Sequence, residues 1–125
     1  MALGDFTPDE ANEALRPIAS LISKSEKAQE KLMPGTWQHT MLQSNIRALN
    51  LAYLLINGGA NAGLNITKDE YQESLQSLAS MIAKSEASQV KFSPGTSQHS
   101  LLRNRIKALY IAEAFISAAR NTEVG

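Results

Sequence analysis

A stretch that occurs twice decides the fold of this chain. Residues Lys84 to Leu102 read KSEASQVKFSPGTSQHSLL, and residues Lys24 to Leu42 read KSEKAQEKLMPGTWQHTML. The likeness extends at the same offset of 60 residues from about Phe6/Ile66 to Ile56/Ile116, and roughly half of the aligned positions are identical. A fixed offset of this kind indicates an internal duplication.

Each copy places a Pro-Gly-Thr turn between two helical patterns. Proline at 34 and 94 forces the preceding residue out of helical geometry, and glycine at 35 and 95 permits a tight reversal. Threonine at 36 and 96 is a good cap for the helix that follows. Because the connection is so short, we expect the two flanking helices to be antiparallel neighbours.

The helices have recognisable starts and a bundle-like apolar pattern. Thr7-Pro8-Asp9-Glu10 and Thr67-Lys68-Asp69-Glu70 both match a capping box. The first helix of each half should run to about residue 32 or 92, with seam positions spaced alternately by four and three residues. We therefore predict an all-α fold, an antiparallel up-down-up-down four-helix bundle built from two duplicated αα-hairpins with both turns at one end.

Length and composition set the broad class. We interpret residues 1–125 as a single helical domain with internal repeats at 6–56 and 66–116 and a linker at 57–65. The formal net charge is zero and cysteine is absent, so we expect neither a nucleic-acid nor a membrane partner and no disulfide framework. The first residues match no signal peptide, which makes the cytoplasm the expected location.

A polar cluster is expected at the turn end of such a bundle. His39 and His99 lie three residues before the seam positions Leu42 and Leu102, so both should point toward the seam. Inward histidines and carboxylates are how helix bundles hold metals, but a hydrogen-bonded layer that fixes helix register is the simpler interpretation. The metal-ligand candidates are His39, His99, Glu26 and Glu86, and Ser25, Gln29, Ser85 and Gln89 are the polar seam residues beside them.

The second helix of each half is more apolar than a single seam requires. Leu49 to Ile56 reads LNLAYLLI, with only Asn50 polar, and the stretch from Leu109 to Ala119 is similar. A helix of a monomeric bundle needs one apolar stripe, so the surplus favours a subunit contact. The interface candidates are Leu51, Leu54, Leu55, Tyr110, Ile111 and Phe115.

Two functions from different classes follow from these features. The first is a protein-interaction or assembly module that acts as a homodimer, without catalysis or a cofactor. The second is a metal- or small-ligand-binding bundle that uses the polar cluster at the turns.

Trp37, which is Ser97 in the second copy, is interpreted as a local cover for its turn. Arg103, Arg105 and Lys107 fall on different sides of a helix, which is typical of a solvated surface.

Overall fold

The chain folds into four helices. A computed structural model describes residues 6–58 and 65–122. In these residues the helices are α1 (Pro8–Glu30), α2 (Trp37–Gly58), α3 (Lys68–Gln89) and α4 (Ser97–Thr122). The predicted all-α fold is confirmed. Most of the predicted linker, residues 59–64, lies outside the described part of the chain.

Both predicted capping boxes are present at the starts of α1 and α3. The backbone N–H of Glu10 donates to Thr7 Oγ1 at 3.0 Å, and the backbone N–H of Thr7 donates to Glu10 Oε1 at 3.0 Å. The same pair of bonds joins Thr67 and Glu70 at 2.9 and 3.1 Å. Each box satisfies two backbone donors that a helix start would otherwise leave unpaired, which is why α1 and α3 begin where they do.

The two turns have the same geometry. Gly35 and Gly95 adopt φ angles of +95° and +93°, in the left-handed region that favours glycine. Thr36 Oγ1 accepts a hydrogen bond from the backbone N–H of His39 at 3.3 Å, and Thr96 Oγ1 accepts one from the backbone N–H of His99 at 3.2 Å, so both threonines cap the helix that follows. The glycine and threonine of each repeat therefore have the roles that the sequence pattern predicts.

The first helix of each repeat ends slightly earlier than the predicted residues 32 and 92. After Glu30 and Gln89 the backbone tightens, because Leu32 N–H donates to the carbonyl of Gln29 and Phe92 N–H to that of Gln89, at 3.0 and 3.1 Å. Bonds that span three residues replace the regular helical bonds there, and they lead the chain into the turn.

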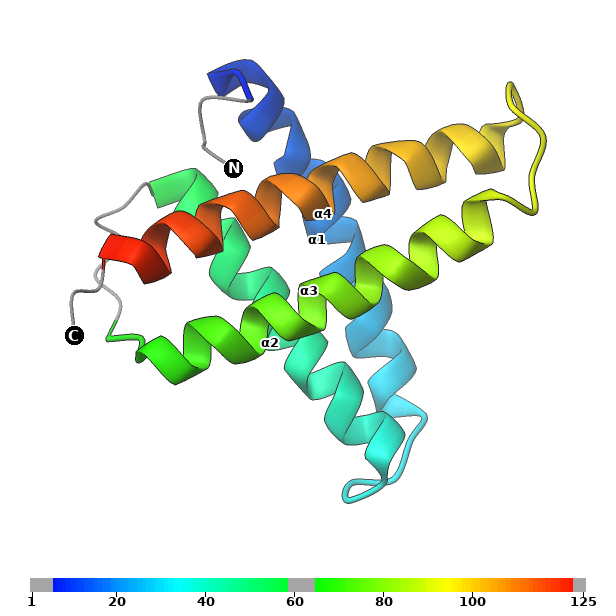
Figure 1. The fold of residues 1–125 in the computed structure, drawn as a ribbon. Helices are drawn as coiled ribbons and strands as arrows, with labels where there is room; N and C mark the ends of the chain where they lie inside the picture. The colour runs from blue at the N-terminus through cyan, green and yellow to red at the C-terminus, as the bar shows by residue number, and fades with distance from the viewer. Residues whose placement is uncertain (1–5, 59–64, 123–125) are drawn as a thin grey trace.

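Figure 1 shows each pair of helices doubling back at its turn, and the two pairs crossing one another. We call α1 with α2 hairpin 1, and α3 with α4 hairpin 2. The turn of hairpin 1 lies at the lower end of the view and the turn of hairpin 2 at the upper right. The expectation that both turns share one end of an aligned bundle is therefore wrong.

The crossed arrangement explains the apolar surplus of the second helices. Helices α2 and α4 pack against each other, and each also packs against α1 and α3. Because they have neighbours on three sides, their buried residues extend around more than one face of the helix. The largest fully enclosed core residues are Ile18, Leu49, Leu78, Leu109, Ile111 and Ile116.

The glycine geometry yields a first prediction. Replacing Gly35 or Gly95 with alanine should lower the free energy of unfolding by about 1 kcal/mol, because a Cβ resists positive φ. An added Cβ would meet nothing within 4 Å at either position, so no steric clash adds to this cost. Urea unfolding followed by circular dichroism measures the change. Asparagine, which tolerates this region better, should cost less than alanine, and equal losses would contradict the conformational explanation.

A second prediction tests the packing of the central helices. Ala52 and Ala112 are completely buried and occupy equivalent positions in the two repeats. Replacing Ala112 with leucine should cost about 1–3 kcal/mol, because the enclosed position has no room for the larger side chain. The same substitution at the exposed Ala79 is the matched control and should change stability by less than about 0.5 kcal/mol. Equal effects in urea titrations would show that Ala112 is not tightly packed.

Candidate functional surfaces

The same hydrogen bonds tie the two helices of each hairpin together near the turn. The side-chain amide of Gln29 donates to the backbone carbonyl of His39 at 3.3 Å, and that of Gln89 donates to the carbonyl of His99 at 3.4 Å. Each glutamine therefore contacts its histidine through the main chain and not through the imidazole. This arrangement stabilises the end of the hairpin without using the chemistry of the imidazole.

The four metal-ligand candidates do not come together. His39 and His99 are both half-buried, near separate turns, whereas Glu26 and Glu86 are exposed. Glu86 Oε2 accepts a hydrogen bond from the hydroxyl of Tyr110 at 3.0 Å. Within residues 6–58 and 65–122, no group of three or more histidine, cysteine or acidic side chains has an arrangement that would hold a metal ion. The expected convergence at one turn end is thus absent because the hairpins cross.

The interface candidates separate into two groups. Leu51, Leu55 and Ile111 are 7, 4 and 1% exposed and belong to the core of the single chain, so the interpretation of these three as a subunit contact is wrong. Phe115 is partly buried against the same core. Leu54 and Tyr110, exposed at 46 and 39%, remain at the surface. The sequence suggested more apolar residues than one chain could bury, because it does not show that α2 and α4 each have three neighbouring helices.

Large apolar side chains are exposed at the two turns instead. Met33 and Trp37 are 75 and 69% exposed beside the first turn, so the expectation that Trp37 covers the turn is wrong. Beside the second turn, Val90, Phe92 and Leu101 are 84, 38 and 55% exposed. We call these five residues the hairpin tips. Sequence reasoning missed most of them, although Val90 stands where the first repeat has the charged Glu30.

Two grooves lie between the hairpins at equivalent positions. The α2–α3 groove has a volume of 430 Å³ and is lined by residues that include Arg47, Leu54, Glu73 and Ser74. The α1–α4 groove, of 330 Å³, is lined largely by residues 60 positions away in the other repeat, such as Lys107 for Arg47 and Glu13 for Glu73. Each groove is formed where the first helix of one repeat crosses the second helix of the other.

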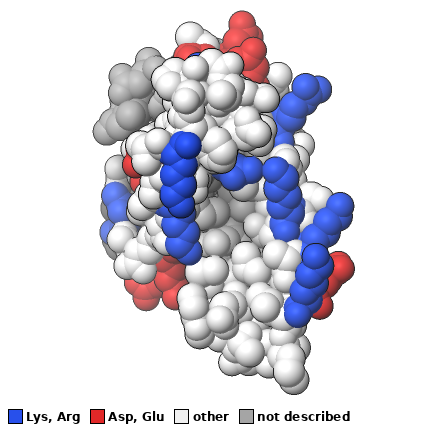
Figure 2. Space-filling model, turned by 90° about the vertical axis from the view of Figure 1, so that its right-hand side faces the viewer, with Lys and Arg blue, Asp and Glu red and all other residues white. Residues whose placement is uncertain are grey.

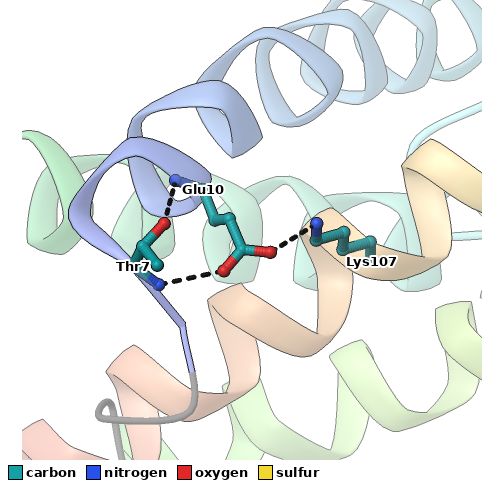
Figure 3. A network of polar contacts seen from close by, with 3 residues as sticks. All are labelled: Thr7, Glu10 and Lys107. Atoms are coloured by element: carbon teal, nitrogen blue, oxygen red, sulfur yellow. Dashed lines mark hydrogen bonds and ion pairs between the residues drawn. The ribbon is translucent and has the colours of Figure 1, made fainter.

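An ion pair bridges the α1–α4 groove. Lys107 Nζ lies 2.6 Å from Glu10 Oε2, and Figure 3 shows how this contact joins the capping box of α1 to the middle of α4. The hydrogen bond from Lys107, with the backbone bond from Thr7, holds the pKa of Glu10 below its ordinary value of 4.5. In the α2–α3 groove, the hydrogen bonds from Thr67, with a smaller effect of the charge of Arg47, lower the pKa of Glu70. No ion pair joins Glu70 to Arg47 in the described residues.

Charge is unevenly distributed although the net charge is zero. Figure 2 shows lysine and arginine side chains gathered around a depression on one face, with acidic side chains toward its borders. In the part of the chain that the structure describes, no helix has the length and hydropathy required to span a membrane.

Comparison with known proteins finds no match among family models, curated proteins or solved structures.

The ion pair yields a third prediction. Because its folded-state pKa is lowered, Glu10 contributes stability that is present above its unfolded pKa and is lost as the pH falls through its folded pKa. Replacing Lys107 with methionine should raise the pKa of Glu10 toward 4.5 and leave that of Glu70 unchanged. Carboxyl-carbon NMR titrations measure both values.

Stability measurements provide the matching control. The loss of stability in Lys107→Met should be evident at neutral pH and should shrink as the pH falls through the folded pKa of Glu10, because Glu10 then becomes protonated in the unmodified protein as well. An equal loss at neutral and at acidic pH would show that the lysine acts through packing of its aliphatic stem and not through its charge.

Proposed function

We propose that this chain is a small interaction module that assembles with a second copy of itself through its hairpin tips, without catalysis. One observation carries the proposal. Among the large hydrophobic side chains exposed in residues 6–58 and 65–122, five of seven belong to the tips, and the other two are Leu54 and Tyr110. Exposed apolar residues that gather at each of the two tips are typical of protein-binding surfaces.

Energetics support a contact at the tips. Hiding one large apolar side chain from water is worth about 2 kcal/mol, so the four to six side chains that two tips from different copies bring together support a dimer at micromolar concentration. Tryptophan is enriched among the residues that dominate binding energy, and Trp37 is the single tryptophan of the chain. The tips project beyond the crossing of the hairpins, so a second copy can reach them without disturbing the core.

The proposal also includes how the chain is built and where it acts. We take the chain to be two duplicated antiparallel αα-hairpins, an interpretation supported by the repeated capping boxes, turns and glutamine bonds. We place the module in the cytoplasm, where disulfides are rare, because a chain without cysteine does not depend on disulfides for its stability. The alternative of a metal site at the turns has less support, because its four candidate ligands come from separate ends.

Sedimentation velocity of a tip variant tests the proposal. Met33→Ser with Trp37→Ser introduces the residues that the second repeat has at the same positions, Ser93 and Ser97, so the variant should keep its fold. We expect the unmodified protein to sediment as a dimer at tens of micromolar and the variant as a monomer with unchanged circular dichroism. Val90→Glu, which copies Glu30 of the first repeat, tests the other tip.

A matched control separates the tips from the earlier interface candidates. Leu54→Ala copies Ala114 of the second repeat and should leave the dimer intact. If Leu54→Ala dissociates the dimer and the tip variants do not, the contact lies on the middle of α2. A monomer at all concentrations of the unmodified protein would remove the assembly proposal.

A further inference from the structure

Each chain has two hairpin tips, and their side chains differ although their backbones are alike. We call Met33 and Trp37 tip 1, and Val90, Phe92 and Leu101 tip 2. The two turns share the positive φ of their glycines and the hydrogen bonds of their threonines, so the tips differ in the side chains that they present. Because the tips lie at separate ends of the crossed hairpins, each can meet the other only on a second copy of the chain.

Apolar and polar residues are exchanged between the tips. Both residues of tip 1 stand where the second repeat has serine, at positions 93 and 97. In tip 2, Val90 is 84% exposed and stands where the first repeat has Glu30. The exposed apolar residues of the two tips therefore occupy different positions on equivalent turns, and the tips present different surfaces to a partner.

The tips also differ in charge. The stretch 87–112, which contains tip 2, has no acidic residue, and Lys91 and Arg103 are exposed within it. At tip 1, the exposed residues Glu30 and Lys31 carry both signs. Neither Glu30 nor Lys91 makes an ion pair within residues 6–58 and 65–122. Exposed charges of this kind add little to affinity, but they disfavour contacts in which like charges face each other.

Two copies can close a dimer in two ways. Figure 1 shows both tips extending from the crossing away from the C-terminal end of α4, so two copies that face each other can bring both pairs of tips together around a two-fold axis. If like tips meet, two copies of tip 2 bring Lys91 and Arg103 together without a carboxylate from either. If unlike tips meet, Glu30 of each tip 1 comes to the cationic tip 2 of the other copy. Charge therefore favours the second dimer.

We propose that tip 1 of one copy binds tip 2 of a second copy, with two such contacts around a two-fold axis. The indole of Trp37 packs on the apolar side chains of tip 2, and Glu30 faces Lys91. This pairing rests on the self-assembly proposed above, and it specifies which surfaces of the two copies recognise each other.

Sedimentation velocity of two variants, alone and mixed, tests the pairing. Met33→Ser with Trp37→Ser removes the apolar surface of tip 1, and Val90→Glu with Leu101→Gln removes most of that of tip 2. Each variant alone should be a monomer at tens of micromolar. Their equimolar mixture should form a dimer, because the first variant keeps tip 2 and the second keeps tip 1. Unchanged circular dichroism of both variants shows that their helices are intact.

The outcomes separate this pairing from self-assembly in general. A monomeric unmodified protein would remove both proposals. An unmodified protein that dimerises, with a mixture of variants that stays monomeric, would overturn only the pairing of unlike tips. Dimerisation of either variant by itself would also overturn it, because one kind of tip would then bind its own copy.

Exchange of charge tests the same pairing without removing apolar surface. Glu30→Lys and Lys91→Glu should each raise the dissociation constant of the dimer by at least about threefold, and the two changes combined in one chain should restore it. Lys68→Glu, at the exposed start of α3, is the control and should have no effect. A double variant that dimerises as weakly as the single variants would contradict the placement of Glu30 opposite Lys91.

Discussion

The contact between α2 and α4 is the constraint on which the rest of the molecule depends. These two helices contact each other and both outer helices, so they supply most of the core. Ala48, Ala52, Ala108 and Ala112 are all at most 2% exposed, and they occupy equivalent positions in the two repeats. Small buried side chains of this kind allow neighbouring helices to approach closely.

Crossing of the hairpins determines which surfaces remain available. It places Leu51 and Ile111 in the core, and it separates the two turns. The polar groups near the turns consequently bond within their own hairpin, as Gln29 and Gln89 do. The apolar residues that extend past the crossing have no helix to cover them, which is why the exposed hydrophobic surface lies mainly at the tips.

The two repeats differ in their side-chain contacts. Gln29 also donates to Gln43 at 2.8 Å, a bond without a counterpart because the equivalent of Gln43 is Arg103. Lys107 bonds to Glu10, whereas Arg47 makes no such bond to Glu70. Two identical repeats would form two identical grooves. Instead, an ion pair bridges the α1–α4 groove, and none bridges the α2–α3 groove in the described residues. The surfaces of the two halves differ because of these substitutions, since the shared residues are mostly used for caps, turns and core.

Local features of this protein were readable from the sequence, and contacts between distant helices were not. Capping boxes at Thr7 and Thr67, the positive φ of Gly35 and Gly95, and the four-helix content depend on neighbouring residues, so the residue pattern predicts them. The crossing of the hairpins depends on how whole helix faces pack, which one apolar stripe does not specify. For that reason only the tertiary structure separates His39 from His99, buries Leu51 and exposes Trp37.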